Sequence, residues 1–357
     1  MKLEELGYSK DFQKLAEELD LADFTVGRVI AEHKERYIVQ AEAGELEAEI
    51  TGNMRFTAAS REDFPAVGDW VALTVFESKH AIIHKVLPRS SMLKRQATGQ
   101  AGEIQLIAAN IDYAFIVQAV DRDFNVNRIE RYLTICHASK IIPVIILTKI
   151  DLLDEQGLSE KIEAVETRFK DVPVLAISNT LHSGYRDLNQ ALIKGHTYCM
   201  LGSSGVGKST LLNNLSGRTV MKTDAISQST NKGRHTTSHR ELVVLDKGAI
   251  LIDNPGMREV GITESAEGLE STFDQISQLA ASCRFKDCTH ISETGCSVID
   301  ALEQGDLDRH VYENYLKLER EKDHFESTLA ERKKKDRDFG KMVKNVKSDM
   351  KKYKPNR

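Results

Sequence analysis

Eight residues in the second half of the chain have the types and spacing of a phosphate-binding loop. They run Gly202-Ser-Ser-Gly-Val-Gly-Lys-Ser209, follow an apolar strand pattern, and open a helical pattern that stops at Gly217. Glycines let successive backbone N–H groups face phosphate oxygens, Lys208 can reach the β and γ oxygens, and the Ser209 hydroxyl can hold Mg²⁺. An ordinary glycine turn is the competing interpretation, but it does not account for the flanking strand and helix.

A second phosphate-facing element is expected at Asp253-Asn-Pro-Gly256. It follows the apolar run Gly248 to Asp253, about fifty residues after the phosphate loop, where P-loop enzymes place an acid near Mg²⁺. The N–H of Gly256 would then sense the γ-phosphate. Alone, D-x-P-G is a common turn, so its position after a strand carries the prediction.

Between these two elements lies the polar, glycine-led segment Gly233 to Ser238. Such a segment suits a switch loop whose threonine hydroxyl completes the Mg²⁺ shell, and either Thr236 or Thr237 can fill that role. His235 is a candidate for positioning the attacking water, with docking of RNA or of another domain as the alternative. The residue after Gly256 is Met257, which cannot orient water by hydrogen bonding, so we expect slow intrinsic turnover.

The base-reading element is Thr148-Lys-Ile-Asp151, directly after an apolar run. A carboxylate at Asp151 accepts hydrogen bonds from the N1–H and the exocyclic amine of guanine, and adenine offers no matching donors. An acceptor left unpaired costs about 1–3 kcal/mol, so Asp151 should select GTP over ATP. Ile177-Ser178-Asn179 ends the next apolar run, where a GTPase supports guanine O6 with a backbone N–H.

The order of these motifs is unusual, because base reading precedes phosphate binding. In an ordinary GTPase domain the phosphate loop comes first. Termini of compact domains often lie close together, so joining the old ends and cutting elsewhere keeps every strand in place. The sequence therefore predicts a circularly permuted G domain whose last switch continues directly into the C-terminal part.

A cysteine and histidine cluster, C-x4-C-x-H-x5-C, follows the predicted G domain. Four sulfur and nitrogen ligands with no vacancy are typical of a structural zinc site. Buried free thiols are the alternative, and they fit the other two cysteines, Cys136 and Cys199, which we expect in the core. The expected ligands are Cys283, Cys288, His290 and Cys296.

The elements around these motifs indicate three structured parts. Short β-rich runs from about Phe24 to Leu87 suit a small barrel, for which an OB-fold is one candidate. From Asp112, apolar strands alternate with amphipathic helices, which implies a parallel sheet covered by helices, completed by the runs at Thr197–Met200, Glu241–Asp246 and Gly248–Asp253. Beyond about Glu264 only helical patterns remain.

Composition narrows the function further. The 357 residues are 41% hydrophobic and carry a net charge of −5, which argues against a protein that coats nucleic acid evenly. Residues 331–357 are nevertheless strongly basic, as expected of a solvated helix end or an RNA contact. The N-terminus lacks a signal-peptide pattern, and no apolar stretch is long enough to span a bilayer, so we expect a cytoplasmic protein without a membrane contact.

Taken together, these motifs resemble the RsgA (YjeQ/YloQ) family of circularly permuted GTPases that depend on the small ribosomal subunit. The resemblance covers nearly the whole chain, and further motifs carry it: G-R-V at 27–29, G-D-W-V at 68–71 and L-P-R-S-S at 87–91. It implies an N-terminal OB-fold, a central permuted G domain and a C-terminal zinc-binding domain, acting late in maturation of the 30S subunit through 16S rRNA. Thr148 and Ser178-Asn179 depart from the general GTPase patterns Asn-Lys-x-Asp and Ser-Ala.

The resulting fold prediction is an α/β P-loop GTPase domain, circularly permuted, flanked by a β-barrel and a mainly helical zinc-binding domain. Its expected parts are an acidic lead-in and barrel (1–93), the G domain (94–263), the zinc-binding domain (264–330) and a basic tail (331–357). We expect a monomer that binds GTP and GDP. The GTP-binding residues predicted are Thr148, Lys149, Ile150, Asp151, Ser178, Gly202, Ser203, Ser204, Gly205, Val206, Gly207, Lys208, Ser209, Thr210, Asp253 and Gly256.

Two other functions fit part of this pattern. One is an ATP-using P-loop enzyme, which the acceptor at Asp151 argues against. The other is an RNA-binding assembly scaffold that rarely hydrolyses its GTP, which differs from the enzyme in showing no turnover stimulated by 30S particles.

Overall fold

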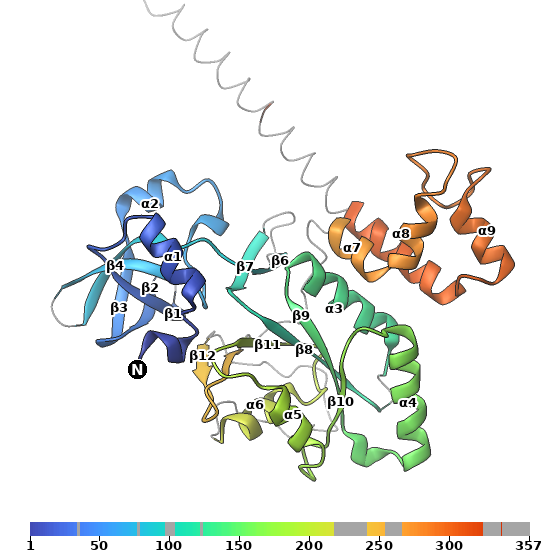
Figure 1. Ribbon diagram of the computed structural model, residues 1–357, viewed down its shortest axis with the longest axis horizontal. Coiled ribbons are helices and arrows are strands. Elements are labelled where there is room, and N and C mark those ends of the chain that lie inside the picture. Colours follow the sequence, from blue (N-terminus) through green and yellow to red (C-terminus); the bar gives the residue numbers. More distant parts are fainter. Residues whose placement is uncertain are drawn as a thin grey trace, which may run out of the picture.

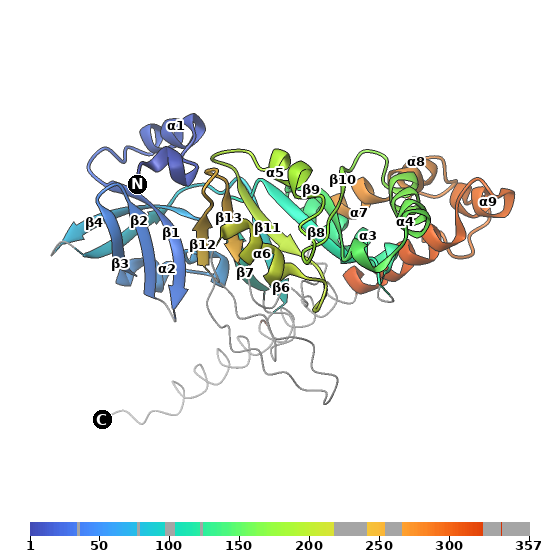
Figure 2. The ribbon, with the colours of Figure 1, turned by 90° about the horizontal axis from the view of Figure 1, so that it is seen from below.

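The structure is a computed structural model that describes residues 1–33, 36–76, 79–96, 104–121, 124–217, 241–253, 266–323 and 337. A barrel, a central α/β domain and a helical domain follow one another along the molecule (Figures 1 and 2). The switch segment with His235, Thr236 and Thr237, the residues Gly256 and Met257, and the basic tail apart from Arg337 lie outside the described residues.

The N-terminal barrel is closed by five strands. Its order is β1-β2-β3-β5-β4, β4 pairs back onto β1, and β3 runs parallel to β5. Helix α2 (Gly52–Thr57) and the short turn η2 (Arg61–Asp63) connect β3 to β4. This is the connectivity of an OB-fold, so the barrel prediction is confirmed. The strands are β1 (Thr25–His33), β2 (Arg36–Ala41), β3 (Gly44–Ile50), β4 (Trp70–Phe76) and β5 (His80–Val86).

The acidic lead-in is helical and packs on the barrel. It comprises η1 (Leu3–Leu6) and α1 (Lys10–Glu18), with Ser9 accepting the N–H of Phe12 as the helix cap. The rings of Tyr8 and Phe12 lie 4.7 and 5.8 Å from the ring of Trp70, centroid to centroid. Aromatic packing of this kind fixes the lead-in against the start of β4.

The central domain is built on a parallel sheet in the order β10-β9-β8-β11-β13. Its strands are β8 (Tyr113–Ala119), β9 (Ile142–Thr148), β10 (Val174–Ala176), β11 (Thr197–Leu201) and β13 (Ile250–Asp253). Its helices are α3 (Val126–Ala138), η3 (Ile150–Leu152), α4 (Glu155–Arg168), α5 (Tyr185–Ala191) and α6 (Lys208–Ser216).

The two faces of this sheet bury alternate residues of each strand, as the two-residue period of a strand requires. On one face, Ile116 of β8 packs in a core with Leu133 of α3. On the other face, Val117 packs with Leu188 of α5 and Leu211 of α6. Both faces are covered, which explains why the strands read as continuous apolar runs.

One strand departs from the parallel arrangement expected for all of them. β12 (Glu241–Val244) is antiparallel to β13, because the turn between them, with Gly248 at φ +79°, is far too short for a parallel crossover. β12 also pairs with β1 at Ala31 and Glu241, so barrel and central sheet form one eleven-stranded sheet. A separate hairpin of β6 (Met92–Gln96) and β7 (Ile104–Ala109) was not anticipated, and the expected boundary after residue 93 falls within β6.

The C-terminal domain is helical in its described residues. It contains α7 (Ala266–Thr272), α8 (Asp274–Ala280), α9 (Ser297–Gln304) and a helical segment over 309–323. Within the described parts of the chain, no helix has the length and apolar character needed to cross a membrane.

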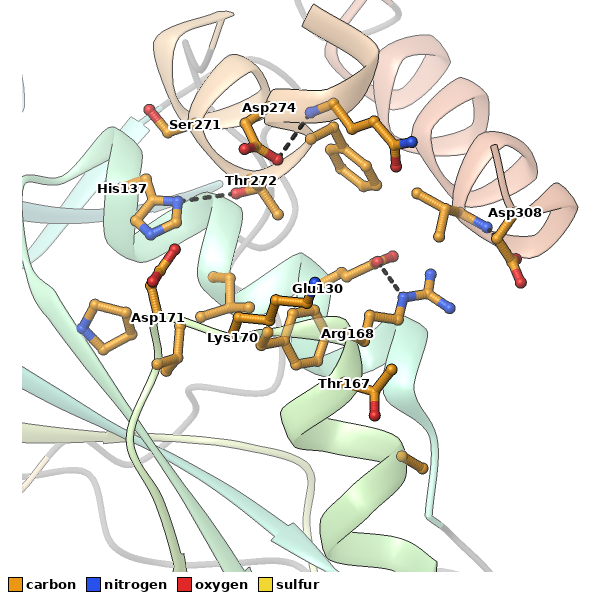
Figure 3. A pocket seen from close by; sticks show the side chains of 18 of the residues that line it. Glu130, His137, Thr167, Arg168, Lys170, Asp171, Ser271, Thr272, Asp274 and Asp308 are labelled. Atoms are coloured by element: carbon orange, nitrogen blue, oxygen red, sulfur yellow. Dashed lines mark hydrogen bonds and ion pairs between the residues drawn. The ribbon is translucent and has the colours of Figure 1, made fainter. Parts of the chain in front are cut away.

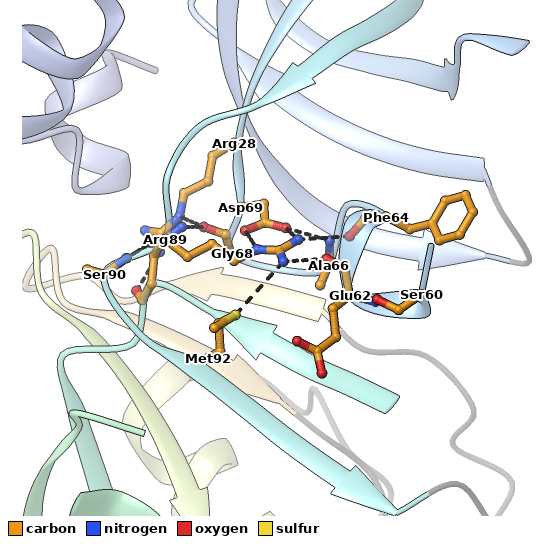
Figure 4. Close-up of polar contacts among 11 residues, drawn as sticks. Arg28, Ser60, Glu62, Phe64, Ala66, Gly68, Asp69, Arg89, Ser90 and Met92 are labelled. Carbon is orange, nitrogen blue, oxygen red and sulfur yellow. Dashed lines mark hydrogen bonds and ion pairs between the residues drawn. The ribbon is translucent and has the colours of Figure 1, made fainter. Parts of the chain in front are cut away.

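Buried polar contacts join the barrel to the central domain, and we call Arg28, Asp69 and Arg89 the junction cluster (Figure 4). Arg28 is 1% exposed and donates to four oxygens: those of Leu6, Gly68 and Asn110, and the hydroxyl of Thr197. Burial lowers the pKa of Arg28 to about 10. The motifs G-R-V, G-D-W-V and L-P-R-S-S thus meet at one point.

Arg89 completes the junction cluster. Its guanidinium donates to both carboxylate oxygens of Asp69, at 2.8 and 2.7 Å. Burial raises the pKa of Asp69, and the hydrogen bonds and charge of Arg89 oppose that rise. The planar guanidinium of arginine can make two parallel hydrogen bonds to one carboxylate. Arg89 therefore offsets the free-energy cost of burying the Asp69 carboxylate.

Candidate nucleotide site

The predicted phosphate loop connects β11 to α6, at the edge of the sheet where the parallel strands end. Gly202, Gly205 and Gly207 all have positive φ, at +149°, +77° and +98°. A Cβ at Gly202 would stand 2.3 Å from the carbonyl oxygen of Val117 in β8. Only glycine fits that position, so the loop is built by the close approach of its backbone to the neighbouring strand.

Lys208 begins α6, and its side chain folds back over the loop. Its ammonium donates to the carbonyl oxygens of Gly202 at 2.7 Å and Ser203 at 2.5 Å. These contacts keep the charge at the loop that is expected to cradle phosphates. Ser209 and Thr210 follow in the first turn of α6, where N–H groups lack helical partners and favour anions.

The base-reading motif lies at the end of β9, in the turn η3. Lys149 adopts the left-handed conformation at φ +60°, and its ammonium pairs with Asp121 at 2.8 Å. Asp151 is exposed, and its Oδ1 accepts the hydroxyl of Ser178 at 2.5 Å. The Ser178 hydroxyl in turn accepts the N–H of Leu181 at 3.0 Å. Ser178 therefore orients the carboxylate while leaving it open to a ligand.

Thr148, the departure from the usual asparagine, links the base-reading motif to the phosphate loop. It is fully buried, and its hydroxyl donates to the carbonyl oxygen of Val206 at 2.6 Å. One hydrogen bond from Thr148 thus spans the two motifs and holds them in contact. The sequence alone could not reveal this link, because it depends on β9 and β11 ending at the same edge of the sheet.

The remaining predicted residues are placed only in part. Asp253 ends β13, which is parallel to its neighbour β11, so the backbone of Asp253 lies at the same sheet edge as the phosphate loop. His235, Thr236, Thr237 and Gly256 lie outside the described residues. Their roles stay predictions.

A residue that sequence analysis missed connects this site to the C-terminal domain. Tyr132, on α3, lies near enough to Ser203 of the phosphate loop for that side chain to lower the pKa of its phenol, although burial raises this pKa overall. In sequence it looks like one more residue of an amphipathic helix. Its position near Ser203 depends on how α3 lies relative to the end of β11, which no local pattern encodes.

The other side of α3 is packed on the C-terminal domain. Gly268 of α7 approaches α3 so closely that a Cβ there would stand 2.5 Å from the carbonyl oxygen of Thr134. Arg131 makes two hydrogen bonds to Glu321, at 2.5 and 2.7 Å. Helix α3 therefore lies beside the phosphate loop at Tyr132 and contacts the C-terminal domain through several residues.

A cleft of about 1030 Å³ separates the rest of this interface, lined from α3 and α4 on one side and from α7, α8 and residues 308–311 on the other (Figure 3). His137 meets Thr272 across it at 3.0 Å, and burial lowers the pKa of His137. Glu130 accepts Arg168 Nε at 2.6 Å and also bonds Asn314, while burial raises its pKa. These polar contacts around an open space add to the apolar core that Leu133 of α3 shares with Leu269 and Phe273 of the C-terminal domain.

The predicted metal ligands come together in the C-terminal domain. The ligand atoms of Cys283, Cys288, His290 and Cys296 all lie within 4.8 Å of one another. The Nδ1 of His290 lies 3.6 Å from Cys283 Sγ and 3.4 Å from Cys296 Sγ, and these two sulfurs are 3.9 Å apart. A tetrahedron with metal–sulfur bonds of about 2.3 Å has sulfur–sulfur edges of roughly 3.8 Å. The cluster therefore has the dimensions of a tetrahedral metal site.

Comparison with known proteins agrees with this geometry. The family model described as RsgA GTPase matches residues 86–263, and a second, ABC transporter, matches residues 185–348; both segments include the phosphate loop. The chain is 42% identical to small ribosomal subunit biogenesis GTPase RsgA 1 of Bacteroides thetaiotaomicron, over 96% of this chain and 95% of that protein. It is 41% identical to the RsgA of Opitutus terrae, over 90% of each chain.

Solved structures give the same result. YjeQ from Thermotoga maritima superposes with a TM-score of 0.60 at 27% identity, covering 82% of this chain and 96% of that one. YloQ, described as a circularly permuted GTPase, superposes with a TM-score of 0.59 at 25% identity, covering 87% and 96%. The predicted permuted order of motifs thus agrees with a neighbour that is itself described as circularly permuted. This chain belongs to the RsgA GTPase family, and it is a circularly permuted P-loop GTPase.

Proposed function

We propose that this GTPase binds the small ribosomal subunit in the cytoplasm, assists its late maturation, and hydrolyses GTP faster when the subunit is bound. The observation that supports the proposal is the hydrogen bond between Thr148 and Val206, which joins the motif proposed to read the base to the loop proposed to bind phosphates. The relatives named as small ribosomal subunit biogenesis GTPases supply the partner.

Within this site, each group has a separate task. The N–H groups of residues 202–207 and the first turn of α6 face the phosphates, and Lys208 moves from the loop carbonyls to the β and γ oxygens. Asp151 accepts the N1–H and amine of guanine, and the backbone at Ser178 and Asn179 meets guanine O6. Thr148, Lys149 and Ile150 hold this arrangement.

Mg²⁺ is proposed at the same sheet edge, since the first turn of α6, with Ser209, and the end of β13 at Asp253 both lie there. Ser209 and either Thr236 or Thr237 would hold the ion. When bound, it neutralises charge that develops on the phosphate oxygens. The proposed domains are 1–93, 94–263, 264–330 and 331–357, in a monomer.

Replacing Asp151 by asparagine should weaken GDP binding by about ten- to hundredfold, because an amide NH₂ faces the donors of guanine. The same amide matches the extra carbonyl of xanthine, so XDP binding should strengthen. Dissociation constants for GDP, XDP and ADP measure both effects. Asp154→Asn is the matched control, since Asp154 caps α4 through the N–H of Gly157 and asparagine retains that cap. Unchanged GDP affinity in Asp151→Asn would refute guanine reading by this carboxylate.

The metal in the C-terminal cluster is proposed to be one structural zinc, since three thiolates and an imidazole with tetrahedral spacing are the donors that zinc prefers. We expect about one zinc per chain, lost in Cys288→Ser together with the folded C-terminal domain. Elemental analysis and limited proteolysis measure the two effects. Cys136→Ala changes a buried thiol of α3 and should retain the metal. Zinc content that stays at one in Cys288→Ser would contradict the assignment.

The ribosomal partner can be tested by sedimentation. Purified small subunits should carry the protein through a sucrose cushion in the presence of a non-hydrolysable GTP analogue and less so with GDP. 16S rRNA is the proposed contact, through the barrel, the C-terminal domain and the basic tail. The second function, an RNA-binding scaffold with rarely hydrolysed GTP, predicts the same sedimentation without stimulated turnover. Absence of sedimentation with either nucleotide would refute both.

A further inference from the structure

The turn that follows β10 is tied to the phosphate loop by a side chain with no assigned role. Asn179 Nδ2 donates to the carbonyl oxygen of Gly207 at 3.1 Å. Gly207 is the last glycine of the phosphate loop and caps α6. A Cβ on Gly207 would stand 2.6 Å from that same Nδ2. The absence of a side chain at Gly207 therefore makes room for the amide of Asn179.

Two further residues close a network around this amide. The hydroxyl of Tyr185, on α5, donates to Asn179 Oδ1 at 2.7 Å. Asn214, on α6, donates from Nδ2 to the hydroxyl of Tyr185 at 2.8 Å and to the backbone carbonyl of Asn179 at 3.1 Å. Burial raises the pKa of Tyr185, so its hydroxyl is neutral and free to serve as both donor and acceptor.

This network, Asn179, Tyr185 and Asn214, holds Asn179 by both side-chain atoms and by its carbonyl. Hydrogen bonds in such a chain polarise and strengthen one another. In contrast, the backbone N–H of Asn179 has no acceptor among the described residues. Because its side chain and its carbonyl are both held, the backbone nitrogen of Asn179 is held in place as well.

We propose that Asn179 is a positioning residue for guanine selectivity: clamped by Tyr185, Asn214 and Gly207, it directs its backbone N–H at the O6 of the base. This inference rests on the proposed function, because it places the guanine base beside Asp151. It adds that selectivity at O6 is set by a side-chain network anchored on the phosphate-loop helix. Selectivity at N1 and the exocyclic amine is the separate task of Asp151.

The two tasks can be separated with nucleotide analogues. 6-Thio-GDP keeps the donors read by Asp151 and replaces O6 by sulfur, a weak acceptor; IDP keeps O6 and lacks the exocyclic amine. In Asn179→Ala, GDP affinity should fall about tenfold and 6-thio-GDP affinity much less, so preference for GDP over 6-thio-GDP collapses. Preference for GDP over IDP should not change. Tyr185→Phe, which removes one hydroxyl, should show the same pattern at about threefold.

Tyr113→Phe is the matched control, since the ring of Tyr113 stacks on Tyr198 and its hydroxyl makes no hydrogen bond among the described residues. It should leave all three affinities unchanged. Equal losses for GDP, 6-thio-GDP and IDP in Asn179→Ala, or no loss for any, would overturn the positioning role. Failure of the proposed function is distinct: the unaltered protein itself would then not prefer GDP to ADP.

Discussion

Replacing Lys208 by alanine is expected to lower kcat for GTP hydrolysis by about 100- to 1,000-fold. The ammonium is already held at the mouth of the site by the carbonyls of Gly202 and Ser203, so it needs only to exchange those contacts for phosphate oxygens. No other described residue supplies a cation to the loop in this way. Single-turnover hydrolysis at saturating GTP isolates this chemical effect from weaker binding.

The loss should not come from unfolding. Lys208 makes its contacts within the loop, and the positive-φ glycines that shape the loop are unchanged in the variant. Lys170→Ala, an exposed lysine after α4, is the matched control and should keep full activity. If Lys208→Ala retained more than about a third of kcat, hydrolysis would have to occur elsewhere, or by a contaminant.

The second large effect concerns the junction cluster. Arg28→Met should lower the free energy of unfolding by about 3 kcal/mol, because buried oxygens of Leu6, Gly68, Asn110 and Thr197 lose their donor together. Urea unfolding followed by tryptophan fluorescence measures the change. The single tryptophan, Trp70, lies under the guanidinium at 5.4 Å, so the probe reports on the junction itself.

Arg36→Met is the matched control on the adjacent strand. The side chain of Arg36 is 76% exposed and faces Glu49 at 3.7 Å, so its removal should cost less than about 0.5 kcal/mol. Equal unfolding midpoints for Arg28→Met and Arg36→Met would contradict a stabilising role for Arg28.

The features that could be predicted from the sequence are those that depend on residues close together in the chain. The phosphate loop, the base-reading turn and the cysteine cluster each consist of neighbouring residues whose spacing fixes their geometry. The barrel followed from short β-rich runs, and the parallel strands followed from continuous apolar runs that alternate with helical patterns. In contrast, the antiparallel direction of β12 and its pairing with Ala31 of β1 depend on a turn and a neighbour that the apolar pattern does not report.

The links between motifs could not be predicted for the same reason. In the sequence, Thr148 is a departure from the usual asparagine. Its role becomes clear only from its hydrogen bond to Val206. In the sequence, Arg28 is one residue of a family motif. The structure shows that it donates hydrogen bonds both to the barrel and to the central domain. Asn179 donates to Gly207, which lies on an element far from it in sequence, and Tyr132 lies near Ser203 in the same way. Such residues become visible when the sheet order is known.

The most direct test is steady-state hydrolysis of GTP and ATP by the purified protein, with and without purified small ribosomal subunits. The proposed function predicts slow GTP turnover alone, strong stimulation of GTP turnover by the subunits, and no stimulated ATP turnover. GTP turnover that the subunits leave unchanged would contradict the claim that they activate this enzyme.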